Sequence, residues 1–145
     1  MAARLDLPVA IHTRAAWDDM CSLLKQECRR AEERGERLRG VLHAYSEDAT
    51  TYRRLKELTE GNFCFGIGGV VTYKKSIVAE AVREMELADL LLETDCPYLT
   101  PVPYRGKRNE SAYVLHTAQK VAELKGLSLD EVAETTAKNA EKMFL

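Results

Sequence analysis

The stretch from Leu90 to Leu99 reads LLLETDCPYL and places three leucines directly before two carboxylates and a proline. A short run of consecutive apolar residues is typical of a strand that is covered on both faces, as in a parallel sheet. Pro97 cannot continue such a strand, because proline has no backbone N–H to donate. We therefore predict a strand from Leu90 to Glu93, with Glu93 and Asp95 at its carboxyl end.

Three earlier apolar runs have the same character, and a helical pattern follows each of them. The runs are 8–12 (PVAIH), 41–43 (VLH) and 63–67 (FCFGI). Apolar residues at three- and four-residue intervals predict helices over 15–34, from a cap at Ser46 or Asp48 to Gly61, over 76–85 and over 111–125. The sequence SLDE at 128–131 fits a capping box that begins a last helical segment.

This alternation of strand and helix predicts an α/β protein in which helices cover a parallel sheet, within a single domain over residues 1–145. Two architectures have this order, an open doubly wound sheet and a piece of a (β/α) barrel. The open sheet usually carries a phosphate-binding loop, and GIGG at 66–69 matches neither GxGxxG nor GxxxxGK[ST]. The barrel is therefore favoured, and these glycines are expected to allow a tight turn or a close approach to a ligand.

Composition excludes several classes of protein. With 145 residues, 46% of them hydrophobic, the chain suits an ordinary globular domain. No apolar run approaches the roughly 20 residues that span a membrane, and MAARLDLPVA lacks the apolar core of a signal peptide, so we expect a cytoplasmic protein with no membrane partner. The four cysteines form no CxxC pair and are expected to be free thiols. A net charge of −2 means that a polyanion would need a local basic patch.

His12, His43 and Asp95 each end a different predicted strand, and the carboxyl ends of parallel strands are where sites form in both architectures. Two imidazoles and one carboxylate can bind a divalent metal and leave a position for water, which the metal makes more acidic. Taken singly, each histidine is more simply a hydrogen-bonding rim residue, and Asp95 is more simply the start of the turn before Pro97. Their occurrence together predicts a metal site.

Glu93 precedes Asp95 by two residues, so both side chains point to the same side of the strand. Glu93 is therefore predicted to orient a metal-binding side chain from behind. An ion pair with a buried lysine or arginine is the alternative for Glu93.

The loop at 98–110 gathers Arg105, Lys107 and Arg108 beside tyrosines, among them Tyr98. Arginine and lysine could bind phosphate oxygens, and the face of Tyr98 could stack on a base. A solvated basic loop with no ligand is the alternative.

Five segments together resemble the TatD family of metal-dependent deoxyribonucleases. They are LPVAIHTR at 7–14, VLHAYS at 41–46, FGIGGVVTYKK at 65–75, LLLETDCPYLTPVPYRGKRNES at 90–111 and ETTAKNAEKMF at 134–144. The resemblance implies a TIM barrel, divalent cations such as Mg²⁺, Mn²⁺ or Zn²⁺, and exonucleolytic cleavage of DNA. It implies that His12 and His43 bind metal after the fifth and sixth strands, and that Asp95, after the eighth, binds metal and handles the proton of the water.

The sequence departs from the family because the HxH pair of the first strand and the metal-bridging glutamate are absent. What remains resembles strands five to eight, the C-terminal half of a (β/α)₈ barrel that typically runs about 250 residues. Half a barrel would leave about six interior side chains uncovered, a loss of burial on the order of 10–15 kcal/mol. We therefore expect the missing N-terminal half, a second copy or another chain to complete the barrel.

The function expected of the complete enzyme is metal-dependent hydrolysis of phosphodiester bonds in DNA, with single-stranded DNA as the substrate. A metal-dependent ester or amide hydrolase on the same type of barrel is the first alternative. A catalytically incomplete half-barrel, acting only as an oligomer or an interaction module, is the second.

Overall fold

The computed structural model describes residues 1–145 and contains one sheet of four parallel strands. The strands are β1 (Val9–His12), β2 (Gly40–His43), β3 (Phe63–Ile67) and β4 (Leu90–Leu92). They lie in chain order, β1-β2-β3-β4, and every neighbouring pair is parallel. Barrel strands follow one another in this way, whereas a doubly wound sheet changes direction at a switch point. The predicted α/β class with four parallel strands is confirmed.

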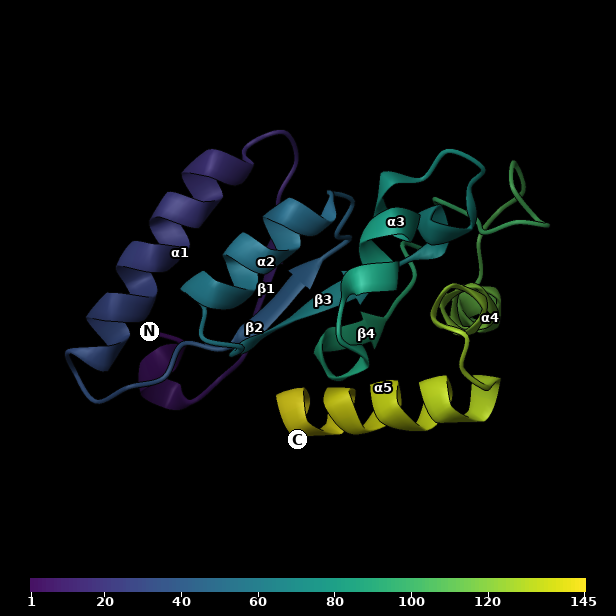
Figure 1. Cartoon of the computed structure of the whole chain (residues 1–145). Helices are drawn as coiled ribbons and strands as arrows, with labels where there is room; N and C mark the ends of the chain where they lie inside the picture. The colour runs from purple at the N-terminus through teal and green to yellow at the C-terminus, as the bar shows by residue number, and fades with distance from the viewer.

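Five α-helices connect and cover the strands (Figure 1). They are α1 (Trp17–Glu32), α2 (Ala49–Leu58), α3 (Ile77–Glu84), α4 (Val114–Lys125) and α5 (Leu129–Phe144). In Figure 1, α1, α2 and α3 lie side by side along the sheet, and α5 lies across the end at which the strands begin. None of the helices is long and apolar enough to cross a membrane.

Local sequence signals set three of the helix ends. The carboxylate of Asp48 accepts the N–H of Thr51 at 2.8 Å and begins α2, which decides between the two caps that the sequence allowed. The hydroxyl of Ser128 accepts the N–H of Glu131 at 3.1 Å and begins α5. Gly126 ends α4 with φ of +66°, a left-handed conformation that costs glycine little.

Most predicted elements differ from the observed ones by one to three residues at their ends. The helix expected over 111–125 begins as a 3₁₀ turn over Ser111–Tyr113, and only Val114–Lys125 is α-helical. The strand expected to reach Glu93 ends at Leu92, although the N–H of Glu93 still donates to the carbonyl of Ile67 at 3.1 Å. The backbone of Glu93 is thus still hydrogen-bonded to β3, although the residue lies just beyond the end of the regular strand.

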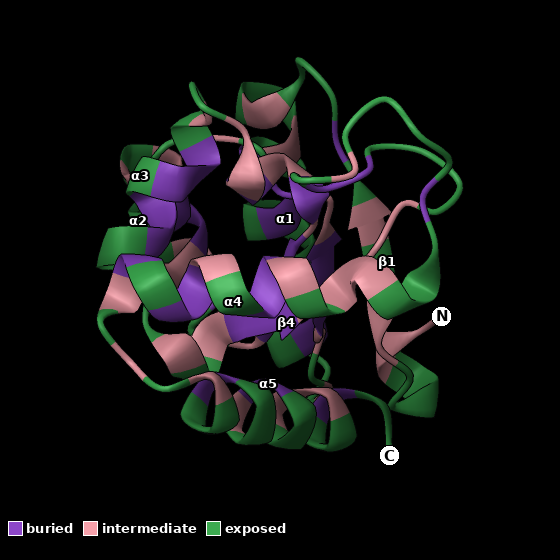
Figure 2. Cartoon of the chain, turned by 90° about the vertical axis from the view of Figure 1, so that its right-hand side faces the viewer, coloured by how far each residue is buried: buried purple, intermediate pink, exposed green.

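The two faces of the sheet are covered unequally. Leu42, Phe65 and Leu90 are fully buried in the large core between the sheet and the helices. On the opposite face a small cluster of Val41, Cys64 and Leu91 packs against Met143 of α5. Along β1 the residues alternate between half-buried and exposed, and Figure 2 shows no buried residue on that strand. The prediction that both faces are covered therefore holds for β2 and β3 but not for β1.

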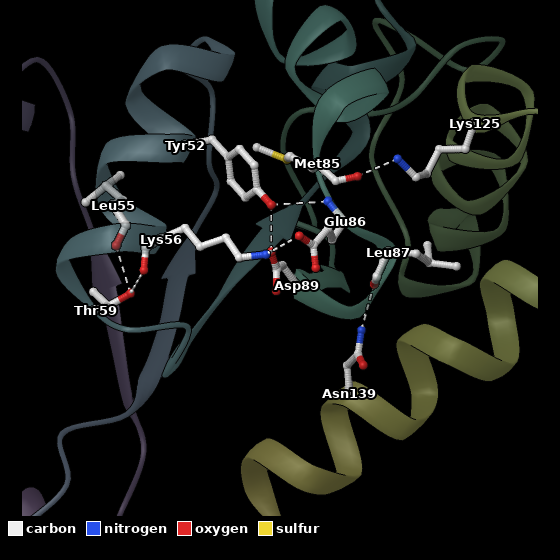
Figure 3. A network of polar contacts seen from close by, with 10 residues as sticks. All are labelled: Tyr52, Leu55, Lys56, Thr59, Met85, Glu86, Leu87, Asp89, Lys125 and Asn139. Carbon is white, nitrogen blue, oxygen red and sulfur yellow. Dashed lines mark hydrogen bonds and ion pairs between the residues drawn. The ribbon is translucent and has the colours of Figure 1, made fainter.

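A polar network fixes the connection that leads into β4 (Figure 3). Lys56 of α2 pairs with Glu86 at 2.7 Å and with Asp89 at 2.8 Å, and Tyr52 donates to Asp89 at 2.6 Å. Burial lowers the pKa of Lys56, but its hydrogen bonds to Asp89 and Glu86 outweigh that effect and raise the pKa. Asn139 of α5 donates to the carbonyl of Leu90 at 2.8 Å, so β4 is held from two sides.

The four cysteines are free thiols, as predicted. Cys21 and Cys64 are buried, and burial raises the pKa of both.

Candidate metal and catalytic site

The two strand-end histidines lie next to each other because β1 and β2 are in register. His12 pairs with His43 in the ladder, and their ring centroids are 5.7 Å apart. Both side chains point to the face of the sheet opposite the main core, since they alternate with the half-buried Ile11 and the buried Leu42.

His43 is held between the two acids that follow β4. Its Nε2 lies 3.1 Å from Oδ1 of Asp95, and its Nδ1 lies 2.9 Å from Oε1 of Glu93. Glu93 also accepts the N–H of Ala44 at 2.5 Å, where the backbone turns with φ of +52° directly after His43. No lysine or arginine pairs with Glu93, so the alternative ion pair is not formed.

The charge of these acids changes the acidity of the histidine. Burial lowers the pKa of His43, but the hydrogen bond and the charge of Glu93, together with the charge of Asp95, outweigh burial and raise the pKa. The proton on His43 and a cation at the same place would be stabilised by the same carboxylates.

Glycine is required at position 66 so that Glu93 can reach His43. A Cβ placed on Gly66 would lie 2.2 Å from Oε2 of Glu93, which is far closer than real contacts allow. At Gly69 a Cβ would lie 2.4 Å from the carbonyl oxygen of Leu99. The groups that approach these glycines closely are therefore the Glu93 side chain and the Leu99 backbone of the protein itself.

His12 and Asp95 line a cavity of about 320 Å³ at this end of the sheet. Arg14, Ser46 and Leu99 line it as well, and Arg14 is the one lysine or arginine that does so. Sequence reasoning missed Arg14. Its position two residues after a strand-end histidine, in the loop where barrel sites form, is the signal that could have identified it.

The donor atoms fit a divalent ion in part. Two ligands at about 2.1 Å from one ion lie roughly 3 Å apart, and Nε2 of His43 and Oδ1 of Asp95 are separated by 3.1 Å. His12 faces the same cavity, but no group of three or more histidine, cysteine, aspartate or glutamate side chains is close enough together to hold a metal ion in this arrangement. The three predicted ligands are thus neighbours, and the distance between His43 and Asp95 is that of two ligands bound to the same ion.

The structure does not bring the predicted basic residues into this cavity. Arg105, Lys107 and Arg108 are exposed on the loop, and Tyr98 is 74% exposed. The loop itself is fixed by the buried Asn109, whose side chain donates to the carbonyl of Tyr98 at 2.6 Å. Asn109 was also missed, because nothing local in the sequence marks which polar loop residue will be buried.

Several known proteins are similar to this chain over nearly all of its length. The family model described as TatD related DNase matches residues 1–145. The chain belongs to the TatD family. A relative from Bacillus subtilis, named "Uncharacterized metal-dependent hydrolase YabD", is 39% identical over 145 residues, which cover 99% of this chain and 53% of that protein. A relative from Escherichia coli K12, "Uncharacterized metal-dependent hydrolase YcfH", is 38% identical over 141 residues, 97% of this chain and 50% of the relative.

Solved TatD structures share the fold. The crystal structure of YjjV, a TatD homologue from Escherichia coli, matches with a TM-score of 0.84 and 28% identity, over 99% of this chain and 52% of that chain. A TatD family hydrolase from Entamoeba histolytica matches with a TM-score of 0.78 at 20% identity, over 96% of this chain and 51% of its own, which supports the fold alone. The chain spans about half the length of the curated relatives that it matches. The expected divalent-metal cofactor agrees with the names of those relatives, which leave the metal open.

Proposed function

We propose that the intact protein is a metal-dependent hydrolase that cleaves phosphodiester bonds of DNA, with single-stranded DNA as its substrate. The observation that carries the proposal is that both ring nitrogens of His43 contact carboxylates, one from Glu93 and one from Asp95. Asp95 in turn lines a cavity together with His12 and Arg14. Membership of the TatD related DNase family supports the choice of substrate.

Each residue has a role that follows from its position. His12, His43 and Asp95 would hold a divalent ion, which when bound supplies positive charge at the phosphate and a more acidic water. Glu93 accepts from Nδ1 of His43 and so leaves Nε2 of the neutral ring available as a ligand. The free carboxylate oxygen of Asp95 can accept the proton of the attacking water.

Substitution of Asp95 by asparagine in the intact protein tests this proposal. We expect Asp95→Asn to lower metal-dependent release of nucleotides from a labelled single-stranded oligonucleotide by about 10²–10⁴-fold, because the general base and one metal ligand are lost. Asp19→Asn, an exposed aspartate on α1, is the matched control and should retain activity. Activity retained in Asp95→Asn would refute the role assigned to this carboxylate.

The names of the relatives give hydrolysis and metal dependence but no substrate, so a carboxylic ester or amide is the competing substrate class. Turnover of bis(p-nitrophenyl) phosphate and of p-nitrophenyl acetate by the same preparation separates the two. Preference for the phosphodiester is the result that our proposal requires.

We also propose that these four strands are the fifth to eighth of an eight-stranded barrel, completed by a half that precedes them. The sequential strand order and the match to about half of each relative support this arrangement. The unpaired edges of β1 and β4 are where such a half would join.

A further inference from the structure

A second hollow adjoins the cavity of the candidate metal site. It has a volume of about 530 Å³, and Ser46 and Val70 line both it and the cavity that contains His12 and Asp95. A chain-like ligand bound at the metal site could therefore extend into this hollow.

The hollow is positively charged. Lys74, Lys75 and Arg105 line it, and no aspartate or glutamate does. None of these three cations forms an ion pair with a carboxylate of the protein. Their charges are thus available to an anion from outside.

Two contacts fix the position of Arg105 at this hollow, and one hydroxyl group there has no hydrogen-bond partner. The guanidinium of Arg105 lies 4.2 Å from the ring centroid of Tyr73, a cation–π contact that holds it at the wall of the hollow. Tyr73 is itself fixed by its hydroxyl, which donates to the carbonyl of Thr100 at 3.1 Å. Ser76 also lines the hollow, and its hydroxyl oxygen is shielded from solvent without a hydrogen-bond partner.

We propose that Lys74, Lys75 and Arg105 form a binding site for a phosphate of the nucleic-acid strand next to the one that is cleaved. This inference rests on the proposed function and extends it, since it makes the enzyme's affinity depend on a strand longer than one nucleotide. Because the ligand atoms are backbone oxygens, binding at this site is independent of base sequence.

The test is equilibrium binding of a fluorescein-labelled oligothymidylate to the intact protein, measured by anisotropy in EDTA so that no cleavage occurs. We expect Lys74→Gln/Lys75→Gln to weaken binding about tenfold and to reduce the slope of log K against log salt by about 0.7, the value for one phosphate contact on a single strand. Arg105→Gln should weaken binding as well. Lys25→Gln/Lys138→Gln removes the same charge from exposed positions on α1 and α5 and is the matched control.

An unchanged affinity and salt slope in Lys74→Gln/Lys75→Gln would overturn the inference, and so would an equal loss in the control. Failure of the proposed function would be recognised by a different result. In that case the wild-type protein would hydrolyse neither the oligonucleotide nor bis(p-nitrophenyl) phosphate with Mg²⁺, Mn²⁺ or Zn²⁺, whatever the binding data in EDTA show.

Discussion

At the scale of single residues, the candidate site depends on how His43 is oriented. Both of its ring nitrogens contact carboxylates, and the one behind it, Glu93, reaches it only because Gly66 has no side chain. Gly66, which has no side chain to bind metal or substrate, therefore provides the space from which Glu93 supports the His43 ring.

The exchange of Gly66 for alanine tests this dependence. The added methyl group must displace the Glu93 carboxylate, so we expect Gly66→Ala to weaken metal binding about 10–100-fold, as loss of a supporting hydrogen bond does, and to cost about 1–3 kcal/mol of stability. Isothermal titration with Mn²⁺ and urea unfolding of the intact protein measure the two effects.

Gly68→Ala is the matched control for this experiment. A Cβ on Gly68 would meet its nearest neighbour, Oδ2 of Asp95, at 3.8 Å, which is ordinary contact. Equal metal affinities in the two variants would show that Glu93 does not need the space at position 66.

The residues at strand ends could be predicted from sequence, and the contacts between them could not. His12, His43 and Asp95 were recognisable because each is a polar residue that ends an apolar run, a pattern contained in a few neighbouring positions. The relation between Gly66 and Glu93 depends on the pairing of β3 with β4, which brings together residues 27 positions apart. Long-range packing of that kind leaves no local signal.

At the scale of elements, the short helix α2 depends on its N-cap, because isolated helices of this length are not stable in water. Asp48 satisfies the free N–H of Thr51, and α2 carries the residues Tyr52 and Lys56 that hold the connection into β4. The cap therefore contributes, through α2, to the placement of Glu93 and Asp95.

Loss of this cap should show a defined dependence on pH. The hydrogen bond from the Thr51 backbone lowers the pKa of Asp48, so its contribution to stability is present above the ordinary value of about 3.9 and is lost as the pH falls through the lowered pKa. We expect Asp48→Ala to reduce the melting temperature of the intact protein by a few degrees at pH 7, and by less as the pH approaches 2. Asp48→Asn keeps an accepting oxygen and should melt close to the wild type at pH 7.

Contacts between two connections explain why the phosphate-binding residues were only partly predicted from the basic loop. Its composition identified Arg105 as a phosphate-binding candidate, but its position is set by Tyr73, which lies on a different connection. The cations at 74 and 75 were not assigned from sequence, because nothing there indicated that they would line the same hollow as Arg105.

At the scale of the whole molecule, the uncovered surface lies at β1 and α1. A hollow of about 300 Å³ is lined there mainly by apolar side chains, including Val9, Ile11 and Leu23. Leu23 is 53% exposed, and β1 forms the edge of the sheet. We propose that this surface is covered by a further half-barrel, corresponding to the half of each relative that this sequence does not match. That half would also pair with the edge strand β1.

The 145-residue chain by itself should therefore not behave as a compact monomer. Light scattering is expected to give a mass above that of one chain, 16.3 kDa, because edge strands and apolar surface promote association. A cooperatively melting monomer would contradict this expectation.

A substitution at the uncovered surface tests the same proposal in the intact protein. If the preceding half packs on α1, Leu23→Glu places a charge in an apolar interface and should cost about 1.5–3 kcal/mol in urea unfolding, the value of burying a leucine. Leu115→Glu is the matched control, since Leu115 on α4 is 48% exposed and does not line the hollow, and surface substitutions of this kind stay within about 0.5 kcal/mol. Equal and small effects of the two variants would mean that α1 faces solvent in the intact protein, and the barrel would then have to be completed elsewhere.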